Sequence, residues 1–290
     1  MTAARVSWTD LGDGIRVRQS VAFAMNSVLL LDPAHTVVVD PGVLPGELDD
    51  LARVVGESAP AAVTLFFTHA HWDHVLGRPW WPEARTLAHD RLAGELSRER
   101  DQIRRDADAL AAEHGVRWAR PFEPFRPDLA VSGLKFLHLH PWRLVLRDAP
   151  GHSSSQLTCH LPDQGLLIAA DMLSDIEPPI LDGPCGPYRE TLEALQVLAE
   201  HGAILTIVPG HGGVASGRES VLARFRRDLE YLEALEAGVG AAIASGQSLE
   251  SAQEKLSTMD YTGRRSATYP TEKFHMENVA SAYRSLAARP

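Results

Sequence analysis

The stretch Thr68-His69-Ala70-His71-Trp72-Asp73-His74 places three histidines and one aspartate within six residues. It directly follows residues 61–67, a short β-branched and aromatic run that predicts a buried strand. In an extended chain, residues two positions apart point to the same side, so the first two histidines should face one way. The aspartate and the third histidine begin the next turn and can face them. So many imidazole and carboxylate donors at one strand end indicate a metal site, and one short segment can serve two ions.

The composition sets limits on fold and partners. The chain has 290 residues, of which 44% are hydrophobic and 23% charged, which is typical of a globular protein with a large core. The formal net charge is -10 and the isoelectric point is near 5.7. This acidic balance argues against a nucleic-acid partner, because phosphate contacts need clustered lysine and arginine. We expect one domain, or one domain with an appendage, that acts on a small molecule.

Cysteine usage and hydropathy indicate the compartment. Cys159 and Cys185 form neither a disulfide framework nor a C-x-x-C pair, so we interpret both as inert thiols in a reducing environment. Residues 1–10 contain no apolar segment of a secretory signal, and no apolar run reaches the length needed to span a membrane. The sequence therefore predicts a soluble cytoplasmic protein with no membrane partner.

Three more candidate ligands follow predicted strands. His152 lies in a Gly- and Ser-rich loop after two predicted strands, Asp171 ends the strand predicted at residues 166–170, and His211 follows the strand predicted at residues 203–208. The glycines and prolines beside both histidines allow tight loops that expose a side chain on a fixed backbone. Loops from several strand ends would then meet at one edge of the fold.

The pattern of elements indicates an α/β (α+β) organisation. Two β-rich halves, each followed by a helix, predict two sheets packed face to face with helices outside. Further strands are expected at residues 14–18, 25–31, 36–39, 85–88, 134–140, 143–147 and 156–161, and helices at residues 46–55, 91–113 and 188–201. Beyond residue 216 the pattern is helical, with helices expected near residues 248–256 and 272–287.

These motifs resemble those of the metallo-β-lactamase-fold hydrolase superfamily, in its glyoxalase II- and lactonase-like dinuclear branch. The resemblance rests on His69, His71, Asp73, His74, His152, Asp171 and His211 in the expected order, and on the loops Asp40-Pro41-Gly42 and Pro209-Gly210-His211-Gly212. It implies a four-layer αββα sandwich of the metallo-β-lactamase type. The catalytic domain would span residues 1–216, and residues 217–290 would form a C-terminal helical appendage packed on the core.

The resemblance also implies roles for these residues. His69, His71 and His152 would bind one metal, Asp73, His74 and His211 a second, and Asp171 would bridge them. Two zinc ions per chain are expected, with iron or manganese as other choices. A metal-bound hydroxide, oriented by Asp73 as a catalytic residue, would attack an ester, thioester or lactone carbonyl. Asp40, Thr68 and Ser153 are candidates for holding the free imidazole nitrogens.

Alternatives remain open within the same superfamily. A mononuclear-iron sulfur (persulfide) dioxygenase would need only His69, His152 and Asp171 for its metal, and a β-lactamase-like amide hydrolase would use the full set. A binding protein that keeps metal for stability is the third. Ser174 stands where some lactonases carry a tyrosine that assists the oxyanion, which weakens the lactonase interpretation; because of this position Ser174 is itself a candidate substrate-binding residue.

Several residues outside the ligand set are candidates for substrate binding. Trp80 and Trp81 can line a substrate mouth or pack at its rim, and Tyr188 and Arg189 can offer an oxyanion donor or simply begin a helix. His275 would reach the site only if the tail folds back. The apolar faces of the tail helices must be buried, which makes a homodimer a reasonable expectation.

Overall fold

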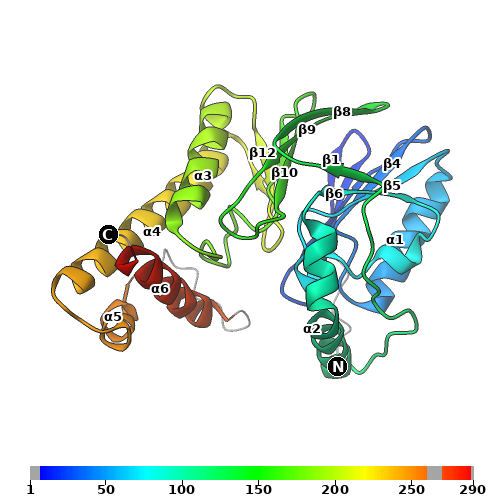
Figure 1. Ribbon diagram of the computed structural model, residues 1–290. Helices are drawn as coiled ribbons and strands as arrows, with labels where there is room; N and C mark the ends of the chain where they lie inside the picture. Colours follow the sequence, from blue (N-terminus) through cyan, green and yellow to red (C-terminus); the bar gives the residue numbers. More distant parts are fainter. Residues whose placement is uncertain (1–6, 260–269, 289–290) are drawn as a thin grey trace. The chain divides into compact units, whose positions relative to one another are not determined.

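The computed structural model describes residues 7–259 and 270–288, and all statements below concern that part of the chain (Figure 1). Residues 1–6 of the amino-terminal stretch analysed above lie outside it. The chain divides into two compact units. The first unit is Met1–Asp148 with Ser155–Gln164, and the second is Ala149–Ser154 with Gly165–Pro290. Each unit has its own apolar core.

A seven-stranded sheet organises the first unit. Its strands follow chain order: β1 (Ser7–Gly12), β2 (Ile15–Gln19), β3 (Asn26–Leu30), β4 (Thr36–Val39), β5 (Val63–Phe66), β6 (Arg85–His89) and β7 (Leu129–Val131). The pairs from β1 to β4 are antiparallel, whereas β4 to β7 run parallel. Neighbouring parallel strands end at one edge, so the residues that follow β4 and β5 are brought side by side.

Two helices complete the core of this unit. They are α1 (Pro45–Ser58) and α2 (Leu92–Glu113). Helix α1 begins with a proline at its first position, which suits the fixed φ of that residue, and buries leucines at helical spacing. The short 3-10 turns η1 (Trp72–His74) and η2 (Arg78–Trp80) lie between β5 and β6.

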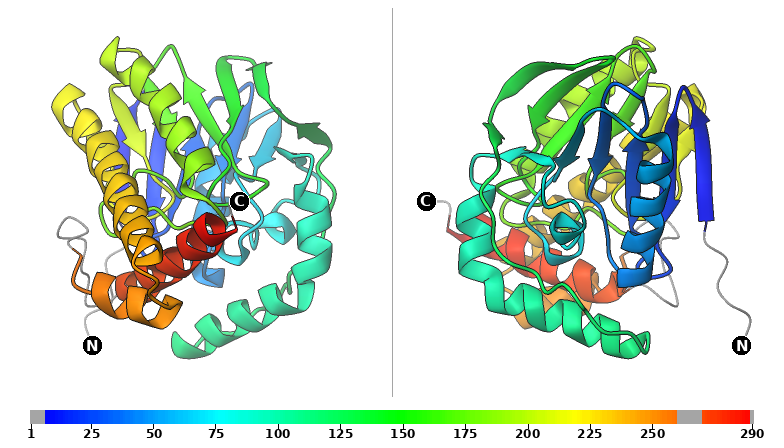
Figure 2. Two further views of the ribbon diagram at one scale, coloured as in Figure 1. Left: turned by 60° about the vertical axis from the view of Figure 1, so that its left-hand side comes forward. Right: turned by 90° about the vertical axis from the view of Figure 1, so that its right-hand side faces the viewer.

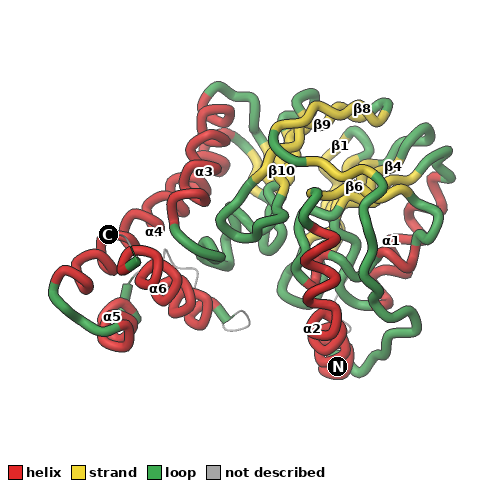
Figure 3. Tube along the Cα trace, viewed as in Figure 1, coloured by secondary structure: helices red, strands yellow, loops and turns green. Residues whose placement is uncertain are grey.

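The first unit also contains three antiparallel strands, which Figure 3 colours with the other strands. These are β8 (Leu134–Leu139), β9 (Trp142–Asp148) and β10 (Leu157–Leu161). Trp142 donates a hydrogen bond from its indole nitrogen to the carbonyl of His35 at 2.8 Å, which ties β9 to the segment before β4.

The second unit combines short strands with four helices. Strand β11 (Leu166–Ile168) pairs parallel with β12 (Thr206–Val208), which pairs antiparallel with β13 (Ala215–Ser216). The helices are α3 (Cys185–Glu200), α4 (Arg218–Ala244), α5 (Leu249–Leu256) and α6 (Thr271–Ala287). Helix α4 packs against α3 and also contacts α5 and α6, and Figure 2 shows α6 beside the far half of α4.

Helices α4 to α6, in the segment expected to form an appendage beyond residue 216, belong to the second compact unit. Helices α4 to α6 share one apolar core with α3 and the strand segment around Leu167. Phe225 and Leu232 of α4 are fully buried in that core, and Leu222 and Leu229 pack against it partly buried. The C-terminal helices are therefore an integral part of the unit that carries β11 and β12. Within residues 7–259 and 270–288, no helix is both long enough and apolar enough to cross a membrane.

Candidate metal centre

The first unit gathers four candidate donors behind β5. Strand β5 is buried, and the chain leaves its end through residues 67–71 into the turn η1, which contains Asp73 and His74. His69 and His74 have no exposed surface, and Asp73 is 8% exposed. The ring of His69 lies 4.6 Å from that of His71 and 4.2 Å from that of His74, between centroids. The short segment thus brings its three imidazoles close together, with His69 and His74 buried and His71 half-buried.

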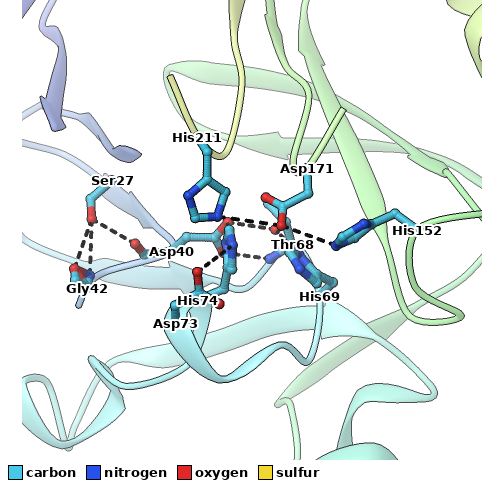
Figure 4. A network of polar contacts seen from close by, with 10 residues as sticks. All are labelled: Ser27, Asp40, Gly42, Thr68, His69, Asp73, His74, His152, Asp171 and His211. Atoms are coloured by element: carbon cyan, nitrogen blue, oxygen red, sulfur yellow. Dashed lines mark hydrogen bonds and ion pairs between the residues drawn. The ribbon is translucent and has the colours of Figure 1, made fainter. Parts of the chain in front are cut away.

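Asp40 fixes the proton positions in this cluster (Figure 4). It follows β4, and its Oδ1 accepts the Thr68 backbone N–H at 2.7 Å. Its Oδ2 accepts the Thr68 hydroxyl at 2.6 Å and Nδ1 of His74 at 2.9 Å. The hydroxyl has one hydrogen, already donated, so at 3.0 Å it accepts from Nδ1 of His69. Both imidazoles therefore carry hydrogen on Nδ1 and present the Nε2 lone pair, as metal-binding histidines do.

The second unit holds the other three candidate donors. His152, Asp171 and His211 are 3%, 6% and 3% exposed. Oδ2 of Asp171 lies 3.2 Å from Nε2 of His152 and 3.6 Å from Nε2 of His211 (Figure 4). Nδ1 of His152 donates to the carbonyl of Ile180 at 3.1 Å. In neutral His152 this leaves an Nε2 lone pair facing a carboxylate oxygen.

That contact fits a shared cation. Two lone pairs 3.2 Å apart repel unless a positive charge lies between them. Ligand atoms at zinc bond lengths of about 2.0–2.1 Å in a tetrahedral site are roughly 3.3 Å apart. The measured separations around Asp171, 3.2 and 3.6 Å, are close to this value. The donor set of the second unit therefore suits a metal ion.

Glycines make the ligand loops of the second unit possible. A Cβ atom on Gly210 would lie 2.0 Å from Oδ1 of Asp171. Gly151, before His152, has φ of +120°, and a Cβ there would lie 2.6 Å from Cα of Tyr188. Both positions exclude any larger side chain, which explains why the sequence has glycine beside each histidine.

Two of the predicted substrate residues form hydrogen bonds to the main chain of candidate metal ligands. The Ser174 hydroxyl donates to the carbonyl of His211 at 2.8 Å and accepts the N–H groups of Ile176 and Glu177. The hydroxyl of Tyr188 donates to the carbonyl of Asp171 at 3.2 Å. Ser174 and Tyr188 are both buried. The contacts favour a role in holding the ligand backbones over direct contact with substrate.

The structure places Arg189 and His275 in helix packing. Arg189 forms an ion pair with Glu236, which joins α3 to α4. His275 is fully buried, and its two ring nitrogens lie 2.9 Å from the hydroxyl of Tyr231 and from the carbonyl of Leu256. These contacts account for both side chains without a substrate.

Trp80 and Trp81 lie at the other end of β5 from the histidines. They line a hollow of about 590 Å³ together with Val63 and Arg85, which begin β5 and β6. The indole nitrogen of Trp80 donates to Oδ1 of Asp49 at 2.7 Å. The segment after the histidine cluster runs back along the sheet before β6 starts, so proximity in sequence does not bring the tryptophans to the donors.

One contact of the candidate site could not be predicted from the types of residue in the sequence. The acceptor for Nδ1 of His152 is the main-chain carbonyl of Ile180, and any residue there could supply it. Asp40 and Thr68, by contrast, are recognisable in the sequence because of their side chains.

Comparison with known proteins defines the class. Residues 22–232, well over half of the chain, match the family model of the metallo-beta-lactamase superfamily. The chain therefore belongs to this superfamily, and its mixed sheets and flanking helices form the α+β fold of that family. Members bind divalent metals, and the histidine and aspartate donors described above suit such ions.

The individual relatives support a hydrolytic enzyme and do not define the bond that it cleaves. A probable metallo-hydrolase of Bacillus subtilis (strain 168), YqgX, is 26% identical over 201 residues, which cover 64% of this chain and 84% of the relative. A metallo-beta-lactamase family protein from Thermus thermophilus has a TM-score of 0.63 at 20% identity, covering 94% of this chain and 93% of that one. A sec-alkylsulfatase from a Pseudomonas species has a TM-score of 0.72 at 12% identity. The match covers 98% of this chain but only 51% of the sulfatase, so this chain spans about half its length.

Proposed function

We propose that this protein is a dinuclear zinc-dependent hydrolase that cleaves an ester, thioester or lactone bond of a small molecule. One metal would be held by His69, His71 and His152, the other by Asp73, His74 and His211, with Asp171 between them. The observation that carries the proposal is the burial of the candidate ligands and the hydrogen bonding of their imidazole nitrogens. Each unit supplies buried candidate ligands, and in three imidazoles Nδ1 lies within hydrogen-bonding distance of an acceptor, so that Nε2 is the ring nitrogen that would coordinate a metal.

Several groups of this chain would prepare the reaction. When bound, the metal pair would lower the pKa of a coordinated water and polarise the carbonyl under attack. Asp40 and Thr68 keep His69 and His74 in the Nδ1–H tautomer, so these imidazoles do not compete for the proton of the water. Ile180 does the same for His152.

Asp73 is the proposed catalytic residue. Its carboxylate lies 3.8 Å from Nε2 of His74 and retains a small exposed surface, which lets it meet solvent at the edge of the donor cluster. It would orient the attacking water and accept its proton at a carboxylate oxygen. Removing such a general base typically costs roughly 10²–10⁴-fold in rate.

Metal content of the purified protein tests the proposal first. Plasma mass spectrometry should find about two zinc ions per chain, and turnover should then be sought in a panel of esters, thioesters and lactones. The panel should include a β-lactam and a secondary alkyl sulfate, because the superfamily and one structural neighbour offer these alternatives. A single iron per chain, with oxygen consumption on a persulfide, would replace the proposal by the dioxygenase.

Two variants and a control connect the metal to the residues. His71→Ala and Asp171→Ala should lower metal stoichiometry and turnover together. His138→Ala, which removes an exposed histidine from β8, should change neither. Full metal content and full turnover in both ligand variants would contradict the proposed site.

A further inference from the structure

The loop that follows Asp171 holds His152 at two points. The carbonyl of Ile180 accepts Nδ1 of His152 at 3.1 Å. The backbone N–H of Asp182 donates to the carbonyl of Gly151, the residue before His152, at 2.7 Å. The orientation of this imidazole therefore depends on where the backbone of residues 179–183 lies.

Helix α6 fixes that backbone. The side-chain oxygen of Asn278 accepts the N–H of Leu181 at 2.9 Å, and its nitrogen donates to the carbonyl of Pro179 at 2.5 Å. The amide is thus hydrogen-bonded to the backbone of the residues on both sides of Ile180. One turn further on, the Ser281 hydroxyl accepts the N–H of Gly183 at 3.1 Å and donates to its carbonyl at 2.9 Å.

A buried chain of hydrogen bonds orients the Asn278 amide. Its second N–H donates to the hydroxyl of Tyr231 on α4 at 2.8 Å. Because Nε2 of His275 must donate to the carbonyl of Leu256, its Nδ1 is the acceptor for the Tyr231 hydroxyl hydrogen. Asn278 and His275 have no exposed surface, and Tyr231 is 2% exposed. A buried amide with all its hydrogens placed has one orientation, since rotating it would set N–H against N–H at Leu181.

We infer that Asn278 is a positioning residue for the metal ligand His152, acting through the carbonyl of Ile180. The C-terminal helices thereby have a specific role, because α4, α5 and α6 supply a rigid, fully bonded support for one ligand. The inference rests on the proposed metal centre and concerns only the metal that His152 would hold.

Selective loss of one metal tests this assignment. Zinc affinities of the metal-free protein would be measured by competition with a chromophoric chelator, and Co²⁺ spectra would report the geometry of each site. Asn278→Ala should lower the affinity for one of the two ions by about tenfold. This is the lower end of the roughly 10–100-fold losses seen when the hydrogen-bond partner of a metal ligand is removed, because Asn278 acts on His152 only through the backbone around Ile180. The affinity for the second ion should stay unchanged.

Val279→Ala is the matched control. It shortens a fully buried side chain on the same helix, and because valine has no polar side-chain atom, the change removes no hydrogen bond to residues 179–183. Thermal unfolding of both variants in chelator measures how far each destabilises the metal-free protein. A purely structural role for Asn278 would make both variants lose metal in proportion to their stability, and that result would overturn the inference.

The remaining outcomes are also decisive. If Asn278→Ala does not fold, Tyr231→Phe takes its place, because it removes the hydroxyl that orients the Asn278 amide. It should lower the affinity for the same ion severalfold. An unchanged affinity in Tyr231→Phe would overturn the inference. If the wild-type protein binds two zinc ions and Asn278→Ala retains both at full affinity, only this inference fails. If the wild-type protein binds no zinc, the proposed function fails and the inference fails with it.

Discussion

Asp40 and His74 are joined by a hydrogen bond of 2.9 Å across 34 positions of sequence. Asp40 follows β4 and His74 closes the turn after β5. The contact exists because β4 and β5 are parallel neighbours whose carboxyl ends share an edge. The same carboxylate accepts two bonds from Thr68, so one buried aspartate sets the tautomers of two candidate ligands.

Replacing this carboxylate should weaken metal binding without removing a ligand. In Asp40→Asn the amide has only one oxygen to accept the three hydrogen bonds, so one imidazole loses its fixed tautomer. We expect metal affinity and turnover to fall roughly 10–100-fold. Chelator competition on the purified variant measures the affinity.

Asp32→Asn is the control for charge. The carboxylate of Asp32 accepts the backbone N–H of Ala34 at 2.7 Å in a turn before β4, a hydrogen bond that an asparagine oxygen can also accept. It should bind metal like the wild-type protein. Equal metal affinities for Asp40→Asn and Asp32→Asn would show that the Asp40 contacts do not matter for the site.

Gly210→Ala should damage the site through Asp171. The added methyl group would lie 2.0 Å from Oδ1 of Asp171 and 3.2 Å from the main chain of Ala170, so the carboxylate must move. We expect loss of at least one metal per chain and a large loss of turnover. Gly240→Ala adds the same group to α4 where nothing lies within 4 Å. It should leave metal content unchanged, and a Gly210→Ala protein that retained two metals would disprove the steric argument.

Much of this architecture is readable from the sequence because it depends on side-chain type. The run before His69 has the β-branched and aromatic residues of a buried strand, and β5 is found within it. The helix predicted at residues 46–55 is found as α1, Pro45–Ser58, since its leucines keep helical spacing. Asp40 could be named as a candidate partner for an imidazole because Asp40-Pro41-Gly42 resembles the aspartate that ends a strand in the superfamily.

Other features depend on tertiary pairing and leave no such pattern. Strand β1 has the sequence SWTDLG, and β13 has only two residues, so both are defined by the strands they pair with. The sequence favours a solvated or helix-packing role for His275 over a role in the site, and the contacts of its ring with Tyr231 and Leu256 show that it packs between helices. The backbone acceptor at Ile180 could not be foreseen from any side chain.

A substitution at Trp80 tests whether this side chain lies away from the substrate. Trp80→Phe removes the hydrogen bond to Asp49 but keeps most of the ring that meets Trp118 edge-on, with centroids 5.9 Å apart. Stability should fall by about 0.5–1.5 kcal/mol, the usual net value of one hydrogen bond. Turnover per metal-loaded enzyme should stay at the wild-type level. A selective rise in KM at unchanged stability would instead place this side chain at the substrate.

Asp128 should make stability depend on pH below the neutral range. The backbone N–H and the hydroxyl of Thr86 both donate to Oδ2 of Asp128 at 2.8 Å, and these two bonds hold the pKa of the carboxyl below its ordinary value of 3.8. The folded state therefore favours the ionised form. Its stabilising effect is complete well above the ordinary value and is lost as the pH falls through it towards the lower folded value.

Thermal unfolding of Asp128→Asn in chelator, between about pH 7 and pH 3, measures this contribution. The variant should unfold at a lower temperature than the wild-type protein near neutral pH, because an amide oxygen accepts the Thr86 hydrogens less strongly than a carboxylate. The difference should shrink as the pH falls below the ordinary carboxyl value, because the carboxyl of the unfolded wild-type chain then becomes protonated and the preference of the folded state for the ionised form contributes less. Asp108→Asn, on the exposed face of α2, controls for the change in net charge. A difference between wild type and Asp128→Asn that stays constant over the whole range would mean that the link between β6 and the start of β7 does not depend on the charge of Asp128.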